Sequence, residues 1–254
     1  MNKKYILALA SILLIETGSV LAMEKPAQPS KKSETISKEI IDRMVQAIDQ
    51  DNADKLAKVL DEYPGLLKMK FDPHLTNALF IAADRGAVNT GKLLLKKGVD
   101  RNQVNQSGAN VMDIAALNNK VPFLQLLIDE GFDVNKLNAN GQAPLYQAIA
   151  FDNVEATDFL LKHGAKTGPI SMKQGQFSLL SSAVFYGAEH VVKLLIEKYK
   201  NDVNAKTFIA GVEITPNDLA VMNSQWRIAQ YLKEHGADST SHYQHMKITV
   251  RNKP

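Results

Sequence analysis

The chain repeats one pattern of apolar residues at a nearly constant spacing, and this periodicity restricts its possible folds more than any other feature. An alanine that follows a short apolar segment recurs at steps of 33, 33, 35 and 37 residues: Ala82, Ala115, Ala148, Ala183 and Ala220. A leucine lies twelve residues after each of them: Leu94, Leu127, Leu160, Leu195 and Leu232. Because the two markers keep step, we expect a tandem array in which each unit packs only against its neighbours.

Each unit is predicted to contain a turn, a short helix, a tight loop and a second helix, because its apolar residues recur at helical spacing. In three units the first helix begins at a residue whose side-chain oxygen can cap backbone N–H groups: Asn110, Ser178 and Thr215. In the third unit Pro144 suits the first helical position, which needs no backbone donor. The second helix ends at a glycine, which readily adopts the left-handed conformation: Gly98, Gly131, Gly164 and Gly236.

The fourth unit departs from this pattern. Tyr199 stands where the other units have glycine, and one extra residue follows within 200–202, so we expect an altered helix exit there. The turns before Ser178 and Thr215 are about two and three residues longer than in the regular units. Such turns are either shaped for a partner or merely tolerate insertions.

Several units resemble ankyrin repeats, whose pattern reads roughly G-x-T-P-L-H-x-A-A-x-x-G and then a helix ending L-L-x-x-G-A-D-x-N. The matching runs are Gly141-Gln142-Ala143-Pro144-Leu145-Tyr146-Gln147-Ala148, Leu160-Leu161-Lys162-His163-Gly164-Ala165, Thr215-Pro216-Asn217-Asp218-Leu219-Ala220 and Gly131-Phe132-Asp133-Val134-Asn135. The resemblance covers about 71–238. It implies an all-α fold, an ankyrin-repeat solenoid of stacked helix-turn-helix units with projecting turns; a different helical array is the structural alternative.

The chain also departs from the family pattern. The threonine-proline pair is complete only at Thr215-Pro216. The family's histidine is replaced in the five units by Phe80, Asp113, Tyr146, Ser181 and Asp218. These replacements are expected to weaken the hydrogen bonds that join neighbouring repeats in the family.

The ends of the array need caps, because a terminal repeat has only one neighbour. We expect residues 37–69 to be a divergent capping repeat, followed by about five repeats from 70 to 238. Its two apolar helical stripes are Ile40, Ile41, Met44, Val45 and Ile48, and then Leu56, Val59 and Leu60. The tail, 239–254, is polar and then alternates at Met246, Ile248 and Val250, so it either adds a short strand or stays disordered.

The first residues read as a secretory signal peptide. Lys3 and Lys4 precede an apolar run, and small residues at Val20 and Ala22 suit cleavage before Met23. We therefore expect a signal peptide over 1–22, a flexible linker over 23–36 and an exported protein, periplasmic or secreted, with no membrane insertion after cleavage. The alternative, a retained membrane helix, is disfavoured because the run is short. With no cysteine in the chain, this protein would be held by packing alone.

No catalytic, metal-binding or cofactor-binding constellation is apparent, so we expect neither an enzyme nor a cofactor. The chain lacks a nucleophile elbow, a phosphate-binding loop and an H-E-x-x-H motif. His242 and His245 could approach one metal only if the tail were helical, and no third ligand has a defined spacing. The formal net charge of +3 is small and interspersed, which argues against nucleic acid.

The resemblance implies that a partner lies against the concave side, formed by the turn tips and by exposed positions of each first helix. By register, the helix positions are Asp84, Arg85, Leu117, Asn118, Ala150, Phe151, Phe185, Tyr186, Met222 and Asn223, and the tips include Gln106, Ser107, Ala139 and Asn140. Five of these large side chains form what we call the apolar stripe: Leu117, Phe151, Phe185, Tyr186 and Met222. The stripe is a candidate hot spot, since interface anchors are enriched in aromatic residues; alternatively, its side chains fold down as extra core.

Three functions are consistent with the sequence. The first is a binding protein of the bacterial envelope, expected to be a monomer that binds another protein. The second, by analogy with the family alone, is a secreted factor that binds a host protein. The third, an enzyme hidden in the tail or the turns, has no visible nucleophile, base or metal set to support it.

Overall fold

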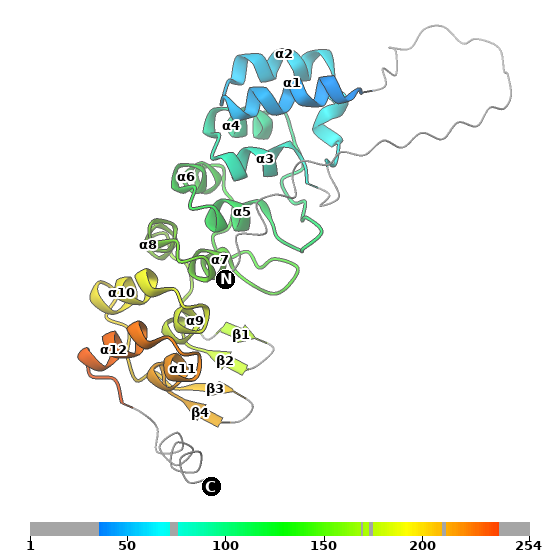
Figure 1. Cartoon of the computed structure of the whole chain (residues 1–254). Coiled ribbons are helices and arrows are strands. Elements are labelled where there is room, and N and C mark those ends of the chain that lie inside the picture. Colours follow the sequence, from blue (N-terminus) through cyan, green and yellow to red (C-terminus); the bar gives the residue numbers. More distant parts are fainter. Residues whose placement is uncertain (1–35, 72–75, 169, 173–174, 210–211, 239–254) are drawn as a thin grey trace, which may run out of the picture.

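The computed structural model describes residues 36–71, 76–168, 170–172, 175–209 and 212–238, which form an elongated stack of helix pairs (Figure 1). The first helices of successive pairs, called here the inner helices, are α1 (Lys38–Asp49), α3 (Ala78–Arg85), α5 (Val111–Leu117), α7 (Pro144–Ala150), α9 (Leu179–Tyr186) and α11 (Pro216–Met222). The outer helices are α2 (Ala53–Glu62), α4 (Val88–Lys96), α6 (Val121–Asp129), α8 (Val154–Lys162), α10 (Glu189–Glu197) and α12 (Trp226–Glu234). Inner helices pack on inner helices and outer helices on outer helices along the stack, which confirms the predicted helical solenoid.

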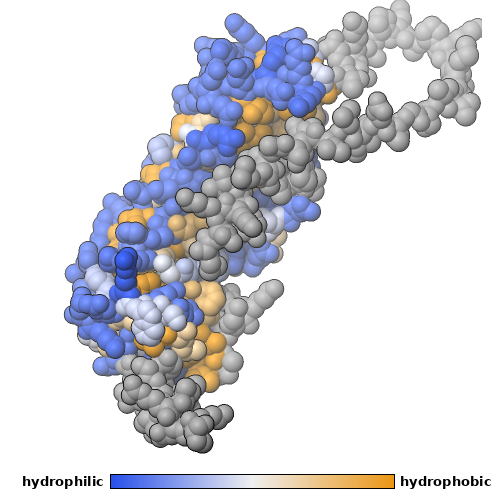
Figure 2. Space-filling model, in the orientation of Figure 1, coloured by the Kyte–Doolittle hydropathy of each residue, from blue (hydrophilic) through white to orange (hydrophobic). Residues whose placement is uncertain are grey.

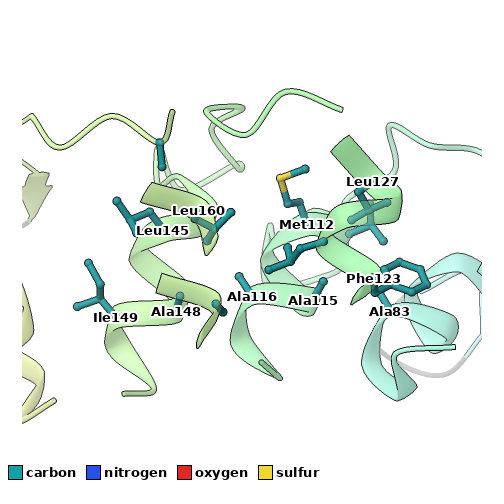
Figure 3. Packing of buried hydrophobic residues seen from close by; sticks show 14 of the residues in the cluster. Ala83, Met112, Ala115, Ala116, Phe123, Leu127, Leu145, Ala148, Ile149 and Leu160 are labelled. Atoms are coloured by element: carbon teal, nitrogen blue, oxygen red, sulfur yellow. The ribbon is translucent and has the colours of Figure 1, made fainter. Parts of the chain in front are cut away.

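The two sequence markers form the core of this stack. All five marker alanines and all five marker leucines are fully buried, at 0% exposure. In the close-up of Figure 3, Ala115 and Ala148 lie on two neighbouring inner helices, and Leu127 and Leu160 come from the outer helices beside them. Small residues let the inner helices approach, and the leucines fill the space towards the outer helices, so each sequence repeat supplies one layer of core.

The predicted helix ends are confirmed. The Asn110 side chain accepts hydrogen bonds from the N–H groups of Met112 and Asp113, at 2.9 and 3.1 Å. The side chains of Ser178 and Thr215 cap α9 and α11 in the same way. All four glycines predicted to end outer helices have positive φ, so these helices end in the left-handed conformation that glycine adopts without strain.

The altered exit predicted at Tyr199 is also confirmed. The left-handed position moves to Lys200, which has φ 52°, and the Tyr199 hydroxyl donates to the Asp158 carboxylate on α8 at 2.8 Å. Burial alone would raise the pKa of Asp158, but hydrogen bonds from Lys162, Lys198 and Tyr199 outweigh it and hold the pKa at about 2. The residue that replaces glycine therefore ties α10 to α8.

The two lengthened turns add a small sheet that the helical pattern did not predict. It consists of β1 (Ile170–Met172), β2 (Gly175–Phe177), β3 (Thr207–Ile209) and β4 (Val212–Ile214), antiparallel in the order β1-β2-β3-β4. Phe208 of β3 lies opposite Gln176 on one side and Glu213 on the other. The added residues give these turns enough length for ladder hydrogen bonds within and between them, so the insertions have a structural role.

The helix pair α1 and α2 begins the stack, followed by a short 3-10 helix, η1 (Pro64–Lys68). Met44, Ile48, Leu56 and Leu66 are fully buried there, and α1 packs on α3. The predicted signal peptide, the linker up to residue 35 and the tail lie outside the described residues. No helix in the described ranges is long and apolar enough to cross a membrane.

Candidate partner-binding surface

The ends of the inner helices, where the apolar stripe lies, are fixed by contacts with the next repeat. Asp152 follows Phe151 in the left-handed conformation, with φ 56°, and its carboxylate accepts the Val191 N–H at 2.9 Å, at the start of α10. The Asn153 side chain donates to the backbone carbonyl of Leu117 at 2.7 Å, at the end of α5. The backbone at Leu117 and Phe151 is thereby held between repeats.

The same device occurs at two other inner-helix ends. Asp51, with φ 45°, accepts the Thr90 N–H at 2.9 Å at the start of α4. Asn119, with φ 54°, accepts the Ala156 N–H at 2.9 Å near the start of α8. Carboxylates and amide oxygens stabilise free N–H groups at a helix start, so each residue caps the outer helix of the following repeat.

Side chains of the apolar stripe differ in exposure. Phe151 is 60% exposed, Met222 49% and Tyr186 37%, although each is large and apolar or aromatic. Leu117 and Phe185 are half-buried. Such side chains at the ends of successive inner helices leave apolar area in contact with water, whereas burying that area against a partner would be favourable.

Phe185 and Tyr186 belong to a chain of aromatic contacts between repeats. The Phe185 ring meets Phe177 of β2 edge to face, with centroids 5.3 Å apart, and meets Tyr186 at 5.2 Å. Tyr186 in turn meets the buried Tyr146 of α7 at 5.4 Å. Partial burial also raises the pKa of the Tyr186 hydroxyl. Phe185 thus folds down onto the core, which was the alternative to an exposed interface residue, whereas Phe151 and Met222 stay largely exposed.

The charged candidates at the start of the surface are joined to one another. Arg85 forms an ion pair with Asp84 and donates from Nε to Asp49 of α1 at 2.8 Å. The Asn118 side chain donates to Asp84 at 3.0 Å. These three predicted partner-binding residues therefore link three successive inner helices, and a partner could contact them only beside or in place of these bonds.

The predicted turn-tip residues form a polar edge. Gln106, Ser107 and Asn140 are exposed, and the Asn140 side chain donates to the Ser107 carbonyl at 2.7 Å. The Ala139 N–H also donates to the Gly108 carbonyl at 2.9 Å, so the two turns lie side by side. Asn223, the remaining candidate, is exposed at the end of α11.

In the part of the chain that the structure describes, five exposed large apolar side chains were not among the sequence-based candidates. They are Val104 at 43%, Leu137 at 59%, Phe208 at 50%, Val212 at 39% and Trp226 at 63% exposure. Hydrophobic surface gathers over β3 and β4 in Figure 2. Val104 and Leu137 lie 33 residues apart, at the same position of two successive repeats. The repeat spacing alone could therefore have identified this pair as equivalent turn residues.

The most strongly perturbed carboxyl near this surface has a structural role. Asp113, whose exposure is 1%, caps α5 by accepting the Asn110 N–H at 2.8 Å. Burial raises the pKa of its carboxyl to about 6, although the Asn110 N–H and the Asn138 side chain act in the opposite direction. Among the described residues, no three His, Cys, Asp or Glu side chains lie close enough together to hold a metal ion.

A stack of short helix pairs, left-handed inner-helix ends and projecting turns defines a repeat scaffold that presents a surface. A family model described as ankyrin repeats (3 copies) matches residues 44–138 and 114–207, and the chain belongs to this family. Its repeats serve in general as protein–protein interaction modules, a scaffold without catalytic function of its own.

Among solved structures, the chain is similar to the human ASB11 ankyrin repeat domain. The sequence identity is 20%, and the match covers 77% of this chain and 84% of that one, with a TM-score of 0.61. At this identity the likeness concerns the fold alone. No curated protein sequence matches the chain.

Proposed function

We propose that this protein is a non-catalytic binding module that holds another protein against its inner helices through the apolar stripe. The observation that carries the proposal is the exposure of Phe151, Tyr186 and Met222 on three successive repeats. Buried aromatic anchors contribute most of the free energy of binding in protein interfaces, and the inter-repeat caps hold Phe151 in place before a partner arrives. The polar turn tips at the other end of the inner helices would form part of the rim.

We further propose that the module acts after export, in the bacterial envelope or outside the cell. The support is the order of residue types in 1–22, where two lysines precede an apolar run that ends in small residues, as in a secretory signal peptide. A secreted factor that binds a host protein is the alternative, and it rests on analogy with the family alone.

The binding proposal is tested by capture with the tagged full chain from envelope extract and from host-cell lysate. Wild type is compared with Phe151→Ser/Met222→Ser, and Trp226→Ser is the matched control because its side chain is as exposed as Phe151 but lies outside the stripe. Circular dichroism first establishes that all three are folded. We expect a protein captured by wild type and the control and lost by the double variant; equal capture by all three would contradict the proposal.

Export is tested separately by fractionating cells that express the full chain and measuring the mass of the recovered protein. We expect a chain that begins at Met23 in the periplasm or the medium. A full-length chain retained in the cytoplasm would contradict export while leaving the binding proposal intact. Recovery inside host cells would favour the alternative.

A further inference from the structure

We infer that the partner meets the inner helices through an uncharged, apolar segment of protein about six residues long. This inference rests on the proposed function and adds the chemistry of the partner. It is carried by the distribution of charge along the stack, which is independent of the exposure of the stripe.

Four successive inner helices, α5, α7, α9 and α11, carry no exposed charged side chain. Their only ionisable groups with a formal charge are Asp113 and Asp218, each 1% exposed and each engaged in a capping box at the start of its helix. By contrast, α1 presents Arg43 and Asp49, and α3 ends in Asp84 and Arg85. The change from a charged to an uncharged surface therefore occurs between α3 and α5.

A surface of this kind selects against charged partners. A lysine or glutamate buried against Tyr186 would lose its hydration and find no counter-ion on the inner helices. Beside Phe151, the Asp152 carboxylate is already engaged by the Val191 N–H and by His190. Apolar side chains pay no such penalty and gain from the burial of exposed Phe151 and Met222. Complementarity here means that neutral surface meets neutral surface.

Among the described residues of the four strands, Glu213 carries the only charged side chain, and it is paired. Lys206 and Glu213 on the described part of the last turn form an ion pair at 2.7 Å. The exposed apolar residues Phe208 and Val212 stand beside them on β3 and β4.

The dimensions of the stack set the length of the segment. Packed helices lie roughly 10 Å apart, so the step from Phe151 beyond α7 to Met222 on α11 spans about 20 Å. An extended chain covers about 3.3 Å per residue, which corresponds to about six residues. A short extended segment can therefore reach all three exposed members of the stripe.

The test uses the full chain and a phage-displayed library of random twelve-residue peptides as the probe. Binders of wild type are counter-screened on the folded variants Phe151→Glu and Trp226→Glu. The best binder is then synthesised with its central apolar residue unchanged or replaced by Lys or Glu, and its Kd is measured in 0.05 and 0.5 M NaCl.

We expect binders rich in aromatic and aliphatic residues and poor in charge, at least tenfold weaker on Phe151→Glu and within twofold on Trp226→Glu. Either charged replacement should weaken binding at least tenfold, and the added salt should change Kd by less than twofold. Charged binders that need Phe151 and weaken in salt would overturn the inference while leaving the binding function standing.

Two other outcomes would also overturn it. If no selected peptide depends on Phe151, the inferred partner chemistry is wrong, and the capture experiment decides the binding function separately. If sedimentation shows a dimer of the full chain that Phe151→Glu dissociates, a second copy of the chain is the occupant instead.

Discussion

The ring of Tyr186 meets the ring of Tyr146 edge to face, with their centroids 5.4 Å apart, and so joins the third repeat to the fourth. Tyr146 occupies the position where the family pattern has histidine, and it is buried, whereas Tyr186 is 37% exposed. One aromatic pair thus serves both packing between repeats and the exposed surface. The stripe is therefore supported from below by the core rather than lying loosely on it.

Members of the stripe should differ in their effect on stability. Phe151→Ala should change the free energy of unfolding by no more than about 0.5 kcal/mol, because the side chain is mostly exposed. Phe185→Ala should cost about 1–3 kcal/mol, because its ring packs on Phe177 and Tyr186. Urea unfolding followed by circular dichroism measures both, and equal costs would contradict the division into exposed and packed members.

The cap at Asp152 provides a second prediction. Asp152→Gly keeps the left-handed backbone available but removes the charged acceptor for the Val191 N–H, so, after the relief of the left-handed conformation at glycine, it should lower the free energy of unfolding by about 1 kcal/mol. Asp152→Asn is the matched control, because its amide oxygen can still accept that bond. If the two variants unfold at the same urea concentration, the inter-repeat cap contributes nothing to stability.

Asp113 should make stability depend on pH. Its folded-state pKa of about 6 exceeds the ordinary 3.8, so between these values the folded state keeps a proton that the unfolded state has lost. Stability from this group is therefore full below about pH 4 and lost as the pH rises through 6, by roughly 2–3 kcal/mol. Asp113→Asn removes the titration, and its stability relative to wild type should increase from pH 4 to pH 7 in urea unfolding. If the unfolding free energies of wild type and Asp113→Asn change in parallel with pH, Asp113 does not titrate as predicted.

Gly91 should be required where α4 meets α6. A Cβ at this buried position would lie 2.5 Å from the nearest atom of the buried Phe123 ring. Gly91→Ala should therefore destabilise the protein by about 1–3 kcal/mol, more than the gain of at most about 1 kcal/mol in helix propensity. In a double-mutant cycle with Phe123→Leu, the smaller side chain should relieve much of this cost; strictly additive effects would show that the ring is not the obstacle.

Much of the fold follows from the sequence because each repeat uses the same positions for the same purpose. Ala148 and Leu160 could be assigned to the core from spacing alone, and Ser178 could be assigned as a cap from its side-chain chemistry. The sheet at Phe208 could not, since an insertion of two or three residues gives no sign of which backbone groups will pair. The pairing depends on two turns 37 residues apart in the sequence, beginning at Ile170 and Thr207, meeting in space.

The candidate surface was predicted less completely. Register alone placed Met222 at an exposed helix end, but it gave the same position to Phe185, whose burial depends on Phe177 in the neighbouring strand. Register also could not show that Arg85 would be engaged by Asp49 of the preceding repeat. Contacts between repeats decide exposure, and these depend on side chains that a single repeat does not contain.

The most direct test of the central claim is the affinity of the captured partner for three full-length proteins: Phe151→Ala, Tyr186→Ala and the matched control Trp226→Ala. Isothermal titration calorimetry measures each Kd against wild type, after circular dichroism has shown equal folding. If the apolar stripe is the binding surface, Phe151→Ala and Tyr186→Ala should each weaken binding at least about tenfold, or 1.4 kcal/mol, and Trp226→Ala less than about twofold. Unchanged affinity for both stripe variants, or a larger loss for Trp226→Ala, would contradict the account.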